Sequence, residues 1–442
     1  MNKKNIFLLM AIIFILLKPA IAQPPNWAAI KSNATFIVPD TTYNTPYIQP
    51  LYVNGWEDGL FITRDGLHLY STYLPLDALS WLFDLLLDPA CFNFNPYYRP
   101  PLLGIDTTTN IWGCLNFMQS DIIISSRTDT SQQFNLWNSS NLQTSFSFDG
   151  GAHGILLNPD TFDVFVFTKD GIGTQSTDIM FMRNVPTNPN TNSAVAILST
   201  PAQEDNPHIE RLNDTTLLLF FDRERYMYYS ISTNNGNSWQ TPVEISNVLN
   251  DQAPYDAQPH LWNDGANWWV YFCADNLNGK RCIYKSKQLI SNNWNSWDAK
   301  ELVIEPDMIV GGSGNVLAVG EPTLTQWGDL SFVVVYGNSN STDTTDVFDA
   351  DPWIMTKKSS PLITVNSNVN NTNSIINIYP NPSSGIFIFK DNKSVKTVEV
   401  FNLLGELILS ETNAKQINLQ GFPKGVYVAR INGVFVNKLV RD

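Results

Sequence analysis

The middle of the chain repeats one pattern of polar and apolar residues five times. Each repeat has a polar start that ends on an aliphatic residue, then a polar turn, then an apolar or aromatic run. The aliphatic ends are Ile62, Ile155, Ile209, Leu261 and Leu324. After a longer first gap they recur roughly every 50–60 residues, and repeated antiparallel meanders of about this size are typical of propeller blades. The pattern predicts a β-propeller of five blades, with six as the alternative.

The apolar run after each turn is expected to form a strand of its blade. These runs are Leu67–Tyr70, Val164–Phe167, Leu217–Phe221, Trp268–Phe272 and Phe332–Tyr336. The excess length of the first gap matches an insertion at about residues 74–118, which contains a helix-like run over Leu76–Leu87. With this insertion included, the predicted propeller spans residues 55–364.

The start of the chain has the pattern of a secretory signal peptide. Lys3 and Lys4 form a basic region, an apolar run follows from Ile6 to Leu17, and Ala20-Ile21-Ala22 supplies a small-x-small cleavage site. The order of these features is that of a cleaved leader, and the apolar run is too short to span a bilayer. We therefore expect residues 1–22 to be removed on export.

Three further segments complete the predicted organisation. Residues 23–54 form an N-terminal segment with no assigned role. Residues 365–373 are nearly all Asn, Ser, Thr and Val, which predicts a linker. Residues 374–442 are expected to form a small C-terminal β-sandwich. The predicted fold class is all-β.

The C-terminal segment carries an ordered series of short motifs. A Tyr-Pro-Asn-Pro run is followed by glycines, a Lys-Gly-Val-Tyr run and a late lysine. The motif positions are Tyr379, Pro380, Asn381, Pro382, Gly385, Gly405, Gly425, Tyr427 and Lys438. The series resembles the C-terminal sorting domain of type IX secretion in Bacteroidetes. The resemblance implies passage through the periplasm, recognition by the type IX machinery, and then release or attachment at the outer surface.

One predicted turn resembles the Asp-box of sialidase-like propellers, Ser-x-Asp-x-Gly-x-Thr-Trp. It runs from Ser232 to Trp239, with Asn234 at the Asp position and Ser238 at the Thr position. In that family the box is a structural turn far from the active site, and the resemblance implies the same role here. Residues 61–70 also resemble the short propeller repeats of bacterial periplasmic proteins. Both resemblances imply a propeller, and neither assigns chemistry.

Composition restricts the classes of partner. The net charge of −14 at pH 7 repels phosphate backbones, so nucleic-acid binding is not expected. No stretch after the leader is apolar enough to cross a membrane, so the mature protein is expected to have no membrane span. Aromatic residues make up 12% of the chain, which suits both a β-rich core and surfaces that stack on sugars.

The four cysteines are expected to form disulfides, because their number is even and the protein is exported. Cys273 and Cys282 flank a turn-like stretch between two strand-like runs, and Cys91 and Cys114 both lie in the insertion. Of the three possible arrangements, 273–282 with 91–114 is preferred.

The polar starts of the repeats supply the candidate functional residues. In a propeller, the inner strands surround a central axis, and equivalent positions converge at one mouth of it. The converging polar set is Glu57, Asp58, His153, Glu204, Asp205, His208, Asp256, His260 and Glu321. His208 and His260 occupy the same position in consecutive repeats, so their side chains are expected to point the same way. The structural alternative is that the acids cap strand starts and the histidines fill a packing position.

Hydrolysis of a glycan is one functional interpretation of this set. Several carboxylates at the mouth resemble the arrangement in five-bladed arabinanases and xylosidases, where an inner-strand Asp is the base and a Glu is the acid. The resemblance implies Asp58 or Asp205 as base and Glu321 as acid. The Asp-Pro context of that family's base is not present at Glu57-Asp58-Gly59. The sialidase alternative lacks an Arg-Ile-Pro motif and an arginine trio.

Binding without hydrolysis is the preferred interpretation. Ligand contacts are expected from His208, His260, Asp256, Glu57 and His153, and Ca²⁺ is the candidate cofactor if any ion is held. The expected ligand is an extracellular glycan or another surface polymer. A structural or adhesive surface protein is the remaining alternative.

Overall fold

The computed structural model describes most of the two predicted domains. The described residues are 27–48, 55–75, 77–78, 102, 120–130, 132–143, 148–170, 177–198, 200–224, 226–246, 248–251, 257–306, 316–337, 348–359, 378–389, 395–402, 407–431 and 434–442. The predicted signal peptide, most of the insertion and the linker lie outside them, as do Cys91, Cys114, Asp256 and Gly405. The chain divides near Pro361 into two compact units.

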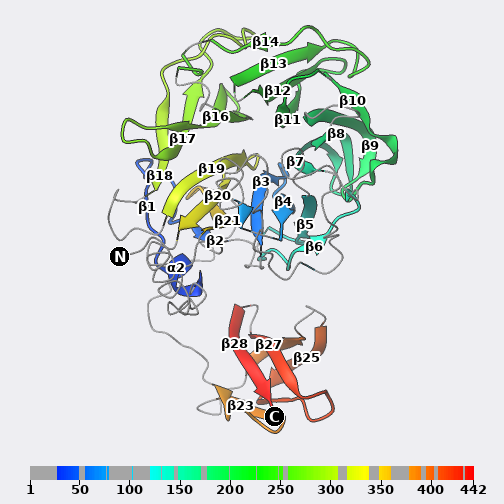
Figure 1. The fold of residues 1–442 in the computed structure, drawn as a ribbon, viewed down its shortest axis with the longest axis vertical. Coiled ribbons are helices and arrows are strands. Elements are labelled where there is room, and N and C mark those ends of the chain that lie inside the picture. Colours follow the sequence, from blue (N-terminus) through cyan, green and yellow to red (C-terminus); the bar gives the residue numbers. More distant parts are fainter. Residues whose placement is uncertain are drawn as a thin grey trace, which may run out of the picture. The chain divides into compact units, whose positions relative to one another are not determined.

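The first unit is a propeller of five antiparallel meanders (Figure 1). Blade one contains β3 (Trp56–Ile62), β4 (His68–Leu74), β5 (Asp121–Ser126) and β6 (Asn138–Ser139). Blade two contains β7 (Asp149–Asn158), β8 (Thr161–Asp170), β9 (Thr177–Pro186) and β10 (Val195–Ile197), the last preceded by the short helix η1 (Thr191–Ser193). Blade three contains β11 (Glu204–Arg211), β12 (Leu217–Arg223), β13 (Tyr226–Ser232) and β14 (Val243–Glu244). The predicted blade number of five is confirmed.

The last two blades incorporate the N-terminal segment. Blade four contains β15 (Ala257–Asn263), β16 (Trp268–Asp275), β17 (Arg281–Lys287) and β18 (Glu301–Pro306), and β1 (Phe36–Ile37) pairs with its outer edge. Blade five contains β19 (Val316–Leu324), β20 (Leu330–Gly337) and β21 (Phe348–Met355), and β2 (Tyr47–Ile48) is its fourth strand. A helix, α2 (Trp27–Ser32), precedes both short strands. The N-terminal segment therefore completes the last blade and closes the ring.

The core lies between neighbouring blades. Ile62, Ile209, Leu261 and Leu324, the repeated aliphatic residues, have no exposed surface, whereas Ile155 is half-buried. Aromatic side chains fill the remaining interface volume in edge-to-face and tilted pairs, as Trp294 and Trp297 do. The described Trp, Tyr and Phe residues of the propeller are all buried or partly buried. The aromatic side chains of the described propeller are therefore used mainly for packing.

The segment that resembles an Asp-box forms a turn between β13 and β14. The Oδ1 atom of Asn234 accepts from the backbone N–H of Ser238 at 2.9 Å, and its Nδ2 atom donates to the Ser238 hydroxyl at 2.8 Å. The backbone N–H of Gly236 donates to the Ser232 hydroxyl at 2.8 Å. These hydrogen bonds close the turn within itself.

The second unit consists of two small sheets around one apolar core. The three-stranded sheet contains β22 (Ile378–Tyr379), β23 (Ile386–Phe389) and β26 (Gln416–Asn418), and the four-stranded sheet contains β24 (Val395–Phe401), β25 (Leu407–Ala414), β27 (Gly425–Ile431) and β28 (Val434–Arg441). Tyr427 is buried in this core and Tyr379 is exposed. The predicted C-terminal β-sandwich is confirmed.

The predicted disulfide between Cys273 and Cys282 is wrong. The two strands do form a hairpin, but Cys273 lies opposite Ile283, and Cys282 lies opposite Ala274. Because successive side chains of a strand point to opposite faces, the two thiols face away from each other. Both are free and buried, and burial raises their pKa well above the usual value for a thiol.

No helix within the described part of the chain has the length and apolarity needed to cross a membrane.

Candidate functional site

Every inner strand has the same irregularity near its start. In all five blades the register between the inner strand and the second strand shifts at this point, which marks a β-bulge. The bulge residue has positive φ each time, and these residues are Gly59 (53°), Gly151 (53°), Asn206 (51°), Gln258 (62°) and Glu321 (53°). Glycine adopts this backbone without strain, whereas the three larger side chains do not. Non-glycine residues held in this region are a feature of functional sites.

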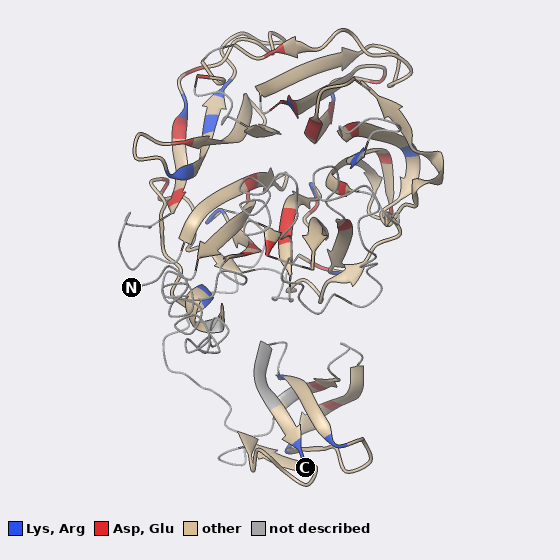
Figure 2. Ribbon diagram, viewed as in Figure 1, with Lys and Arg blue, Asp and Glu red and all other residues tan. Residues whose placement is uncertain are grey.

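The five bulges line one small cavity on the propeller axis. Its volume is about 30 Å³, and the rings of His153, His208 and His260 also line it. A cavity of this size accepts about two water molecules and no sugar ring. Acidic positions recur on the inner strands around this centre (Figure 2). Any larger ligand of the site would therefore lie over the mouth, where Asp58 and Asp205 are partly exposed.

Glu321 is the most strongly perturbed acid of the mouth. Gln258 holds it reciprocally: the Gln258 side-chain amide donates to the Glu321 carboxyl, and the Glu321 backbone N–H donates to Oε1 of Gln258 at 3.2 Å. Burial raises the pKa of Glu321 well above its ordinary value, and the nearby carboxylates of Asp58 and Asp205 raise it further. Both effects favour the protonated form of Glu321.

Two aspartates of blade three form the other half of the acidic group. Asp205 and Asp222 lie opposite each other on β11 and β12. Burial raises the pKa of Asp205 to about 6, although the backbone N–H of Asn206 donates to it at 2.8 Å. Burial raises the pKa of Asp222 to about 7, against hydrogen bonds from the Gln258 backbone at 2.9 Å and the Asn206 amide at 2.8 Å. Three carboxyl groups with raised pKa values thus meet at one mouth.

The structure separates the described acids of the predicted set into three places. Asp58, Asp205 and Glu321 meet at the mouth, Asp58 and Asp205 from the position before the bulge and Glu321 from the bulge itself. Glu57 is fully buried beside Asp349 and Asp351, away from the mouth group. Glu204 is buried as well, where Arg223 and Thr200 donate to it at 2.9 Å and 2.5 Å.

Asp222, Gln258 and Asn206 belong to the mouth and were not among the predicted residues. A signal for two of them was present: Asn206 and Gln258 precede the repeated Pro-His pair of their blades. Asp222 directly follows the apolar run that ends at Phe221. A polar residue at the end of a strand is common, so no signal for it was present in the sequence.

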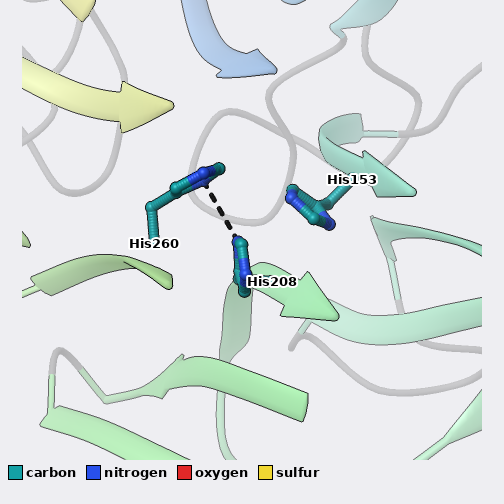
Figure 3. A group of neighbouring side chains, drawn as sticks. All are labelled: His153, His208 and His260. Carbon is teal, nitrogen blue, oxygen red and sulfur yellow. Dashed lines mark hydrogen bonds between the residues drawn. The ribbon is translucent and has the colours of Figure 1, made fainter. Parts of the chain in front are cut away.

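Three histidines from blades two, three and four cluster beside the mouth, with their rings tilted or edge-to-face (Figure 3). The ring centroids of His153 and His208 are 4.0 Å apart, and those of His208 and His260 are 4.2 Å apart. One nitrogen of each ring lies within 4.8 Å of the others, as a metal site would require. Burial lowers the pKa of all three histidines well below the usual value, so the rings are neutral.

The hydrogen bonds of two of the rings determine their tautomers. Nε2 of His260 faces two donors, the Leu324 backbone N–H at 3.0 Å and Arg64 Nη1 at 3.1 Å, so it must accept. The proton of His260 is then on Nδ1, which lies 3.1 Å from Nδ1 of His208 and donates to it. Nε2 of His208 in turn donates to Glu210 at 3.1 Å.

The Nδ1 atom of His153 is also an acceptor, because the Ile209 backbone N–H donates to it at 3.2 Å. Each ring therefore already uses the lone pair of its acceptor nitrogen. Two of the rings accept from the backbone of the next blade, and Thr323 accepts from the Ile62 backbone at 3.1 Å in the same manner. The triad joins neighbouring blades and does not fit a metal centre; three imidazoles are also a poor donor set for Ca²⁺, which takes oxygen ligands.

Metal ions are accordingly expected to leave the stability of the propeller unchanged. Addition of Zn²⁺ or Ca²⁺, or their removal with EDTA, should shift Tm by less than about 1 °C, because an ion that binds only the folded state would raise it. Differential scanning fluorimetry of the full chain measures this. A metal-dependent rise in Tm that His208→Ala abolishes would contradict the assignment.

Arg64 lies beside the histidines. It lies in the turn after β3, and its guanidinium donates to the carbonyl oxygens of Leu324 at 2.8 Å and Leu261 at 2.5 Å. It also forms an ion pair with Glu210. One side chain of blade one thus contacts blades three, four and five. The Arg64 side chain therefore ties four of the five blades together beside the histidines.

The C-terminal unit matches a known family. Residues 377–440 match the model of the secretion system C-terminal sorting domain. This unit directs the protein through type IX secretion to the cell surface or the medium. No curated protein matches the sequence of the chain.

Solved structures of low identity resemble the propeller. The catalytic domain of the Coprinopsis cinerea GH62 α-L-arabinofuranosidase is 11% identical, with a TM-score of 0.45, and the match covers 73% of this chain and 98% of that one. The GH43 endo-arabinanase of Bacillus licheniformis is 7% identical, with a TM-score of 0.40, covering 69% and 96%. The Bombyx mori GH32 β-fructofuranosidase is 8% identical, with a TM-score of 0.41, covering 94% and 91%. Likeness at this level does not identify a substrate.

Proposed function

We propose that the propeller hydrolyses an extracellular glycan at its acidic mouth. The observation that carries the proposal is the meeting at one mouth of two carboxyl groups with different surroundings: Glu321, whose pKa is raised well above its ordinary value, and Asp205, whose pKa is raised to about 6. Carboxyl groups whose pKa values are separated by their surroundings are the acid and base pair of glycosidases. Binding alone, preferred from the sequence, needs no such pair, and the described propeller has no exposed aromatic platform for sugars.

The roles follow from the pKa shifts, which favour Glu321 as the acid and Asp205 as the base. Glu321 gives its proton to the glycosidic oxygen of the leaving sugar, and the bond from that oxygen to the anomeric carbon breaks. A water molecule attacks the anomeric carbon and loses a proton to the Asp205 carboxylate. Proton exchange with solvent then restores both groups. Asp58 raises the pKa of Glu321, and Gln258 fixes its orientation.

Hydrolysis is expected to have a bell-shaped pH dependence. The pKa of Asp205 is raised to about 6, so this base is protonated and inactive below that pH, and activity should rise as the pH passes through about 6. Activity should fall again at higher pH, where Glu321 loses the proton that it must donate. Release of reducing ends from a panel of neutral and acidic polysaccharides by the full chain, followed by kcat/KM across the pH range on any substrate found, measures both limbs.

Asp205→Asn should remove most of the activity and the acidic limb with it. The matched control is Glu301→Gln, which changes an exposed carboxylate of β18 away from the axis. If the pH dependence of kcat/KM of Asp205→Asn kept the same acidic limb as that of the wild type, Asp205 would be excluded as the base. The absence of hydrolysis on every polysaccharide of the panel would refute the proposed function.

A further inference from the structure

A second concave site lies between blades two and three, at the opposite ends of the strands from the acids. The inner strands run from the acidic mouth to the turns after them, and the groove is built at those turns. Its volume is about 350 Å³, against about 30 Å³ for the axial cavity. The lining residues are Ile155, Leu156, Leu157, Asp163, Arg183, Arg211, Asp214 and Asn235. A volume of this order is in the range of small-molecule sites and holds one or two sugar units.

One side of the groove is a fixed polar frame. Arg211 donates from Nε to Asp163 at 2.8 Å and from Nη1 to the Asn235 side chain at 2.9 Å. It also donates from Nη1 to the carbonyl oxygen of Asp214 at 3.1 Å. Because the Arg211 guanidinium is engaged on several sides, it holds the turns of blades two and three in place. The groove is therefore preformed.

The polar groups that remain available to a ligand include both a hydrogen-bond donor and an acceptor. Arg183 is 36% exposed at its side chain, and its contacts with the described residues are long, 3.3 Å to the Asn235 carbonyl and 3.8 Å to Asp163. Among the described residues, the exposed carboxylate of Asp214 has no hydrogen bond or ion pair of its own. Two arginines and two aspartates line the groove, so its formal charge is zero. A ligand with both donors and acceptors and no net charge fits this balance.

The opposite side of the groove is aliphatic. Leu157 is 61% exposed at the end of β7, and Ile155 and Leu156 are half-buried beside it. A strip of apolar surface next to polar groups of both kinds matches the two sides of a sugar ring, with its C–H face on the leucine and its hydroxyls on Arg183 and Asp214. We propose that this groove binds a neutral oligosaccharide. The proposal does not depend on hydrolysis at the mouth.

Calorimetry on the full-length Glu321→Gln protein tests the groove with hydrolysis suppressed. The probes are neutral tri- and tetrasaccharides of glucose, mannose, galactose, xylose and arabinose, with trigalacturonate as the acidic comparison. At least one neutral probe should bind, and Leu157→Asn and Arg183→Gln, each added to that protein, should raise its Kd at least tenfold. Leu277→Asn is the matched control, because Leu277 is a 98% exposed leucine in the β16–β17 turn. It should leave Kd unchanged.

Three results would overturn the groove proposal. They are the absence of binding by any neutral probe, a Kd that Leu157→Asn and Arg183→Gln both leave unchanged, and binding of trigalacturonate alone. An unchanged Tm in each variant shows that the fold is intact. Hydrolysis by the wild-type chain is measured separately, so failure at the groove is distinguishable from failure at the mouth.

Discussion

Glu321→Gln is expected to lower kcat for glycan hydrolysis by about 10²–10⁴-fold, the usual contribution of a positioned general acid. Glutamine keeps the oxygen that accepts from Gln258 and the backbone N–H that donates to it, so the bulge geometry should survive. What is lost is the proton for the leaving oxygen. Steady-state kinetics on the substrate identified by the polysaccharide panel gives kcat and KM, and KM should change little because the mouth is otherwise intact.

Substrates with different leaving groups can distinguish a general acid from a residue that only supports the fold. A dinitrophenyl glycoside of the same sugar departs without a proton, so Glu321→Gln should retain most of its activity on that compound. Loss of activity by the same factor on both substrates would show that Glu321 acts through structure. Full activity of Glu321→Gln on the natural polymer would place the general acid elsewhere.

The ring of blades could be predicted because its packing repeats. A residue that fills the interface between blades must be apolar in each repeat, and Ile62, Ile209 and Leu261 are fully buried for this reason. The closure of the ring could not be predicted in the same way. The strands β1 and β2 are two residues long, and runs of that length have no periodicity to detect.

The mouth was predictable only where its residues share a repeat position. Asp205 precedes a bulge and Glu321 occupies one, and both positions recur in other blades. Arg64 was missed because its turn has the composition of a solvent-exposed loop, and only the closed ring brings it to the axis. The raised pKa of Glu321 also depends on the ring, since burial and carboxylates from other blades cause it. Such contacts are tertiary and leave no local pattern.

Lys31→Met is expected to lower the free energy of unfolding of the propeller by about 3–5 kcal/mol, the effect of leaving a buried charge without its partner. The Nζ atom of Lys31 lies 2.8 Å from Asp349 and 2.8 Å from Asp351, and all three side chains are at least 95% buried. Burial alone would lower the pKa of Lys31, but Asp351, Asp349 and Glu57 outweigh it and raise the pKa. Lys31 is therefore the cation that neutralises a buried group of acids and fixes α2 to blade five.

Urea unfolding followed by tryptophan fluorescence measures this loss, with Lys358→Met as the control. Lys358 also contacts the N-terminal segment, through the Thr41 carbonyl at 2.7 Å, but it is exposed, so its removal should cost less than about 1 kcal/mol. The deficit of Lys31→Met should shrink at acidic pH, because the unpaired carboxylates take up protons and lose the charge that is costly to bury. A deficit equal to that of Lys358→Met, or one independent of pH, would mean that the segment is held by its apolar contacts and strand pairing alone.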